Sequence, residues 1–197
     1  MKFLDCIISL QSSKRKFVAL SKTNVVLAFV IPVWFLTALI GLFFSSKSIE
    51  KPFDPSGTLY YAANKPDFDK KVHRILDNAL DTSLHNVVVH IASNSGCLCQ
   101  RSATRHIKSI KDKVESIDKR NISVYIENID ALSVFLTSTP AIAVFDEDSQ
   151  LSYFGPYSTG IGCLTGNGTV EPYLDTKSTL GAIVPLESTG CYCDVRS

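Results

Sequence analysis

Paired cysteines are the residues of this 197-residue sequence whose type and spacing could do chemistry. Cys97 and Cys99 form one C-x-C motif, Cys191 and Cys193 form a second, and Cys163 lies between them in a glycine-rich segment. The thiolate form of cysteine attacks disulfides and binds metal ions. The sequence therefore indicates thiol–disulfide exchange, structural disulfides or a thiolate metal site.

The cysteines towards the C-terminus allow three interpretations. They could form a structural bridge that fastens an irregular segment, or a relay that passes electrons to or from Cys97 and Cys99. Four or five cysteines could instead bind zinc or an iron–sulfur cluster, although C-x-C is not the usual zinc spacing. The sixth cysteine, Cys6, precedes the apolar stretch and is expected in a reducing compartment. The other five are an odd number, so at least one of their thiols must be free, pair with another chain or bind something. The pairing stays open at this point.

Cys97 and Cys99 lie between a predicted buried strand, residues 86–92, and an amphipathic helix whose apolar positions run from Ala103 to Ile117. The start of this helix contains Arg101 and Arg105 and no carboxylate. Such electropositive surroundings lower the pKa of a thiol. We expect Cys97, the more accessible of the two, to be the nucleophile and Cys99 to be the resolving thiol.

A bridge between Cys97 and Cys99 would require the chain to bend at Leu98. An extended i, i+2 pair spans roughly 6.6 to 7.2 Å, whereas the Cα atoms of a disulfide lie about 4.4 to 6.8 Å apart. Such a bridge would be strained and readily exchanged. It would suit oxidation or isomerisation of other proteins' disulfides.

The hydrophobic pattern predicts an α/β domain with the element order α, β, α, β, β, β. A helix over residues 68–80 comes before the strand 86–92, and the helix that follows the cysteines leads to a strand over 122–126. This βαβ spacing favours a parallel pair. Residues 141–145 and 151–154 are predicted to form an antiparallel hairpin, and residues 171–186 an interrupted helix.

The strand NVVVHIA, the cysteine loop GCLC, the strand ISVYI and the step Thr139-Pro140 before AIAVF together resemble the thioredoxin-like superfamily. The resemblance covers about residues 84–155 and implies a mixed sheet flanked by helices. It also implies that Pro140 is a cis-proline facing the cysteines, with Thr139 beside the incoming thiol. The chain is most similar to an uncharacterised family of membrane-anchored bacterial thioredoxin-like proteins with a cysteine-rich C-terminus. Thioredoxins have C-x-x-C, from which the C-x-C of this chain departs.

A stretch of 20 residues without a charge, 25–44, matches the thickness of a bilayer core and predicts a single transmembrane helix. A cleavable signal is the rival interpretation, but its apolar region is usually shorter. More basic residues precede the span than follow it, so the positive-inside rule predicts a cytoplasmic segment, 1–24. We then expect a linker, 45–64, and an extracytoplasmic domain, 65–197, in the periplasm at a bacterial inner membrane.

The charge distribution argues against nucleic acid as a partner. Residues 1–51 hold 7 of the 20 basic and 2 of the 19 acidic residues, which leaves 13 basic and 17 acidic residues and a charge near minus 4 for the remainder. Nucleic-acid binders need a basic face for the phosphates. The sequence also lacks the motifs of common hydrolases and nucleotide-binding proteins.

The sequence therefore predicts a membrane-anchored thiol-disulfide oxidoreductase or isomerase-like protein. Its clients would be protein thiols or disulfides, its site would consist of Cys97, Cys99, Thr139 and Pro140, and it would need no cofactor. His90, near the cysteine loop, could move a proton but is more often a packed strand histidine. The alternative is a noncatalytic membrane-tethered module with structural disulfides or a thiolate metal site.

Overall fold

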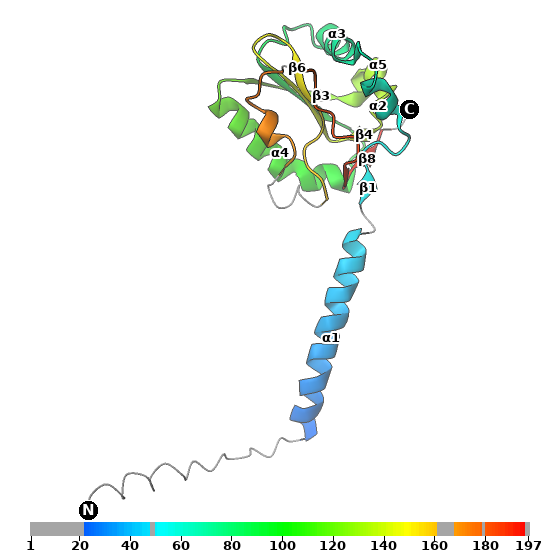
Figure 1. The fold of residues 1–197 in the computed structure, drawn as a ribbon. Helices are drawn as coiled ribbons and strands as arrows, with labels where there is room; N and C mark the ends of the chain where they lie inside the picture. Colours follow the sequence, from blue (N-terminus) through cyan, green and yellow to red (C-terminus); the bar gives the residue numbers. More distant parts are fainter. Residues whose placement is uncertain (1–21, 48–49, 161–167, 179, 196–197) are drawn as a thin grey trace, which may run out of the picture. The chain divides into compact units, whose positions relative to one another are not determined.

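The computed structural model describes residues 22–47, 50–160, 168–178 and 180–195, and divides into two compact units, residues 1–46 and 47–197 (Figure 1). The first unit contains the helix α1 (Lys22–Lys47). Its segment Val26–Phe44 has a mean hydropathy of 2.5 and none of these residues is buried. By length and composition this helix can cross a membrane, as the uncharged stretch predicts.

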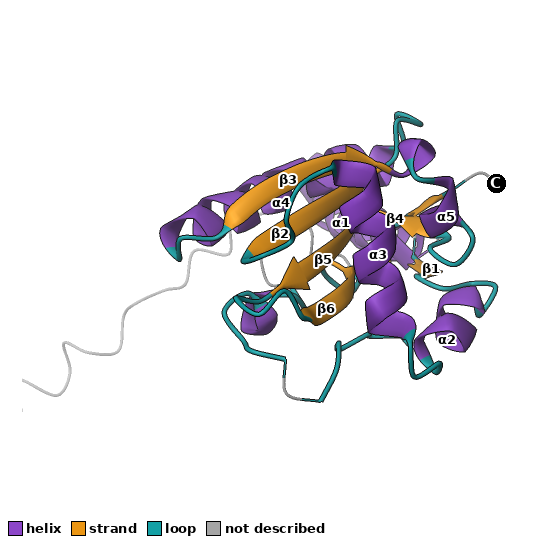
Figure 2. Cartoon of the chain, turned by 90° about the horizontal axis from the view of Figure 1, so that it is seen from above, coloured by secondary structure: helices purple, strands orange, loops and turns teal. Residues whose placement is uncertain are grey.

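The second unit is a mixed α/β fold around a four-stranded sheet with the order β3-β2-β5-β6 (Figure 2). The strands are β2 (Val87–Ala92), β3 (Arg120–Tyr125), β5 (Ala141–Phe145) and β6 (Leu151–Pro156). The predicted parallel pair is confirmed in β2 and β3, and the predicted hairpin in β5 and β6. β5 lies antiparallel to β2 on its other side, which makes the sheet mixed.

The two long helices of this unit, α3 (Phe68–Leu80) and α4 (Leu98–Ser116), cover opposite faces of the sheet. Alternate residues of β2 therefore enter different cores. Val87, Val89 and Ile91 pack in the cluster that contains Val72 of α3, whereas Val88 packs with Val114 of α4. Burial on both faces explains why β2 is almost continuously apolar.

Short elements complete the unit. Two further pairs of strands are antiparallel: β1 (Lys51–Pro52) with β7 (Thr189–Gly190), and β4 (Ser138–Thr139) with β8 (Cys193–Asp194). The remaining helical elements are α2 (Thr58–Ala63), α5 (Asp130–Ser133) and the 3-10 helices η2 (Ile126–Asn128) and η3 (Glu171–Tyr173). The C-terminal strands thus return to elements from the start and the middle of the domain.

Two segments differ from the prediction. Part of the expected linker, 45–64, is folded as β1 and α2, and Phe53 and Leu59 are each 1% exposed in the core. Elements this short show no sustained periodicity, so the pattern missed them. Of the expected helix 171–186, the described residues form only η3, and Gly181 with a φ of +100° lies in the irregular part that follows.

Candidate functional site

The cysteine loop lies where β2 ends and α4 begins. Gly96 has a φ of +67°, a left-handed conformation that glycine adopts without a steric penalty, and it turns the chain from the strand towards the helix. Cys97 is the residue that caps α4, and Cys99 lies in its first turn. The structure therefore places both cysteines at the amino end of a helix, as the sequence predicts.

The loop before Cys97 is fixed by Glu127 of η2. Its carboxylate oxygen Oε1 accepts hydrogen bonds from Ser93 Oγ at 2.6 Å and from the Asn94 amide at 2.9 Å. Desolvation would raise the pKa of Glu127, but the hydrogen bonds from Ser93, from its own backbone amide and from Asn94 outweigh it and lower the pKa below its usual range. An ionised carboxylate thus holds the loop in place.

Two disulfides join the cysteine loop to the C-terminal cysteines. Cys97 is bonded to Cys193, with Cα atoms 6.1 Å apart, and Cys99 to Cys191, with Cα atoms 5.3 Å apart. No bridge joins Cys97 to Cys99. Residues i and i+2 at the start of a helix do not face each other, so each sulfur finds a different partner.

The segment from Thr189 to Val195, here called the tail, is held by main-chain contacts as well as by the disulfides. β7 pairs with β1, and β8 pairs with β4, so that Cys193 lies opposite Thr139 (Figure 1). The Val195 amide donates to the Thr137 carbonyl at 2.9 Å. The tail therefore occupies the edge of β4 next to Cys97.

Tyr192, between the two tail cysteines, anchors the tail in the core. It is 3% exposed, its ring meets the Phe53 ring edge-on at 5.0 Å between centroids, and its hydroxyl donates to the Ser158 carbonyl at 2.8 Å. The sequence analysis did not single out Tyr192. No periodic pattern marks it, because Tyr192 lies between β7 and β8 rather than within a strand.

Thr139 and Pro140 come directly before β5, at the end of β4. The peptide bond between them is cis, and both residues are buried. The tail links Thr139 to Cys97. Thr139 lies opposite Cys193 in the β4–β8 pair, and Cys193 is bonded to Cys97. The hydroxyl oxygens of Thr137, Ser138 and Thr139 are buried and have no hydrogen-bond partner among the residues described.

The charged residues nearest the cysteines in sequence lie on α4 and on the tail. The first turn of α4 contains no acidic residue, and Arg101 and Arg105 are exposed on the same helix. On the tail, Asp194 forms an exposed ion pair with Lys51 at 2.7 Å. Exposed pairs of this kind contribute little to stability.

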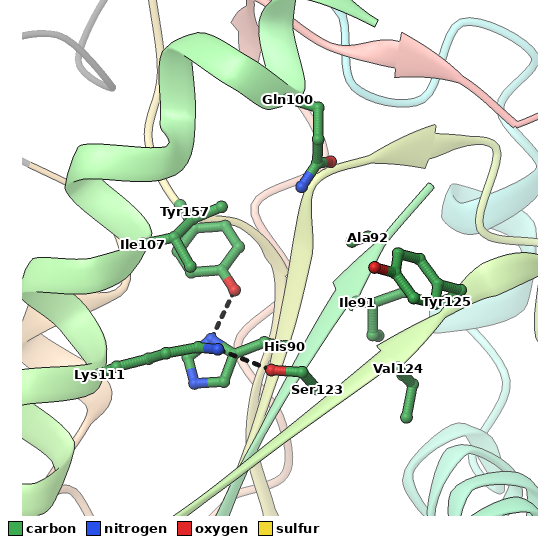
Figure 3. A pocket seen from close by; sticks show the side chains of 10 residues that line it. All are labelled: His90, Ile91, Ala92, Gln100, Ile107, Lys111, Ser123, Val124, Tyr125 and Tyr157. Carbon is green, nitrogen blue, oxygen red and sulfur yellow. Dashed lines mark hydrogen bonds between the residues drawn. The ribbon is translucent and has the colours of Figure 1, made fainter. Parts of the chain in front are cut away.

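His90 lines a cavity of about 220 Å³ between α4, β2 and β3 (Figure 3). The Tyr157 hydroxyl lies 2.6 Å from Nδ1 of His90, and the Asn121 side-chain oxygen lies 2.8 Å from Nε2. Burial lowers the pKa of His90 to about 4. The hydrogen bond to the Asn121 oxygen opposes this shift, and the nearby positive charge of Lys111 adds to it. His90 is therefore a neutral, packed histidine.

Cys6 and Cys163 lie outside the described residues, so the predicted glycine-rich loop around Cys163 is not placed. Within the described residues, no group of three or more His, Cys, Asp or Glu side chains is arranged to hold a metal ion. Cys97, Cys99, Cys191 and Cys193 are present as disulfides rather than as free thiolates.

The fold and the site together define a disulfide-bridged α/β module with an N-terminal apolar helix that fits a membrane anchor. The chain belongs to the family described as "Domain of unknown function (DUF6436)", whose model matches residues 65–195. A comparison with curated proteins finds no match, and a comparison with solved structures finds none either.

Proposed function

We propose that this protein is a membrane-anchored thiol-disulfide oxidoreductase or isomerase-like protein with a thioredoxin-like domain. The observation that carries this proposal is the pairing of both helix-start cysteines with the tail cysteines, beside the Thr139-Pro140 step. The sheet order and the helices on both faces support the thioredoxin-like assignment. The domain would lie outside the cytoplasm, where disulfides persist.

In this proposal the two bridges are the oxidised form of the module. A client thiolate attacks one sulfur of a bridge, which forms a mixed disulfide and releases the other module sulfur as a thiolate. A second client thiol then attacks the client sulfur of the mixed disulfide. The client gains one disulfide and the module gains two electrons for each bridge opened. The reverse sequence, with Cys97 as attacking thiol, reduces a client disulfide.

The position of Cys97 supports a protein client rather than a small molecule alone. Leu98, the residue after it, is 76% exposed and offers an apolar contact. If the tail left β4, the edge of this strand would become available to an extended segment of another chain. The buried hydroxyl oxygens of Thr137, Ser138 and Thr139 would then gain access to water or to the client.

The test measures oxidation of a reduced protein by the full chain purified in detergent. We expect the oxidised chain to form disulfides in reduced, unfolded ribonuclease A, with up to two disulfides formed per chain because two bridges are present. The double variant Cys97→Ser/Cys99→Ser should lose this activity, whereas Cys6→Ser, a control outside both motifs, should keep it. Equal activity in the double variant and the parent chain would show that the bridges are not exchanged, which favours the noncatalytic module.

A further inference from the structure

The two bridges offer four sulfurs to an attacking thiol, and two of these belong to buried cysteines. Cys99 is 7% exposed and Cys193 is 3% exposed, whereas Cys97 and Cys191 are each half-buried. Each bridge thus joins one half-buried cysteine to one buried cysteine, and attack is favoured at the half-buried one. Attack at Cys97 would release Cys193, and attack at Cys191 would release Cys99.

The two possible leaving groups differ in their surroundings. Cys99 lies in the first turn of α4, where main-chain amides lack helical partners, the helix dipole favours a negative charge and no carboxylate is present. Cys193 lies in β8, buried beside the core residue Tyr192 and followed by Asp194. Since a more acidic thiol leaves faster, release of Cys99 is favoured over release of Cys193.

The two bridges also differ in how the main chain holds their tail cysteines. Cys193 is fixed by the β4–β8 pair, in which it lies opposite Thr139. Its departure from Cys97 would have to occur within a paired strand. Cys191 lies in the bend between β7 and β8 and belongs to neither strand. Opening the bridge at Cys191 therefore requires less movement of paired main chain than opening the bridge at Cys193.

From these three contrasts we infer that client thiols open the Cys99–Cys191 bridge first, by attack on Cys191. This inference rests on the proposed function and names the catalytic sulfur of the oxidised module. The client sulfur forms a bond to Cys191, the bond between Cys191 and Cys99 breaks, and Cys99 leaves as a thiolate. A second thiol of the client dithiol then displaces Cys191, so the client is oxidised by two electrons and the module keeps two thiols. Cys99, as the resolving thiol of the same bridge, can also reverse the first step.

The experiment maps the first adduct at low conversion. The oxidised full chain in detergent is treated with a small amount of glutathione, quenched with acid, alkylated and analysed by peptide mass spectrometry. We expect glutathione on Cys191 together with an alkylated Cys99, in excess on the order of tenfold over glutathione on Cys97 with an alkylated Cys193. Predominance of the Cys97 adduct would overturn the inference and leave the proposed function intact. Absence of an adduct at all four cysteines would count against the proposed function itself.

A pair of charge variants tests the physical reason. Arg101→Glu adds a carboxylate near the start of α4, so we expect it to disfavour the Cys99 thiolate and to reduce the preference for Cys191. Lys108→Glu makes the same change of charge at an exposed position further along α4 and should leave the preference unchanged. Equal preferences in the two variants would exclude the helix start as the cause.

Discussion

At the residue scale, His90 shows how burial removes a group from the chemistry. It is 3% exposed, and its two ring nitrogens hydrogen-bond to Tyr157 and Asn121 within the domain. With its pKa lowered to about 4, it cannot carry a proton near neutral pH. His90 therefore does not supply a proton to the bridges near neutral pH.

The depressed pKa of His90 predicts a specific dependence of stability on pH. The unfolded chain binds a proton at this site below about pH 6.5 and the folded chain only below about pH 4, so stability falls as the pH drops through this window. From pH 7 to pH 5 the contribution of His90 to the free energy of unfolding should fall by about 2 kcal/mol. Denaturant unfolding of the parent chain and of His90→Gln at both pH values measures the difference.

A matched control for this measurement is His85→Gln. His85 is exposed, so its substitution should leave the pH dependence of the parent chain unchanged. If His90→Gln lost as much stability on acidification as the parent chain does, the buried, neutral histidine would not be the cause.

At the element scale, the tail is attached by two disulfides that close nearly the same loop. The bridges span 96 and 92 residues of sequence. Once one bridge has closed this loop, the other closes only a small ring between the two C-x-C motifs. The contributions of the bridges to stability should therefore depend on each other.

Removal of both bridges should cost more than the two separate removals added together. On a loop-entropy model, either pair variant, Cys97→Ala/Cys193→Ala or Cys99→Ala/Cys191→Ala, costs about 2 kcal/mol, and the quadruple variant about 7 kcal/mol. Denaturant unfolding in detergent under non-reducing conditions gives the three values. A quadruple loss equal to the sum of the pair losses would contradict the shared loop.

At the scale of the whole molecule, an apolar helix precedes a domain with two disulfides. These features fit an anchor in the membrane and a domain exposed to an oxidising space. The excess of basic residues before the span sets the predicted direction, with the N-terminus in the cytoplasm. The disulfides and the basic residues before the span support the same predicted orientation, for different physical reasons.

A fusion experiment tests this orientation. Alkaline phosphatase, which needs its own disulfides to be active, is fused after residue 195 and expressed in bacteria. We expect an active enzyme, because the domain should lie in the periplasm. The matched fusion after residue 24, before the span, should be inactive. The opposite result for the pair would reverse the predicted orientation.

Much of the element order could be predicted because long amphipathic helices and buried strands leave strong patterns. The apolar repeat of α3, with Phe68, Val72 and Leu76 buried, appears directly in the sequence. The β1 and α2 elements could not be found in this way, since they are two and six residues long and are ordered by packing of Phe53 and Leu59. The irregular chain after η3 could not be found from the sequence pattern either.

The sequence by itself determined that Cys97 and Cys99 lie at the start of a helix, because they follow a strand pattern and precede a helix pattern in any fold that keeps those local patterns. It also determined the apolar span of α1, since twenty uncharged residues are a local property. Only the tertiary structure decided the partners of these sulfurs. Cys191 and Cys193 lie more than ninety residues away in sequence, and the β4–β8 pair and the burial of Tyr192 bring them to the helix. Long-range contacts of this kind depend on the whole packed core, which no local pattern of residues specifies.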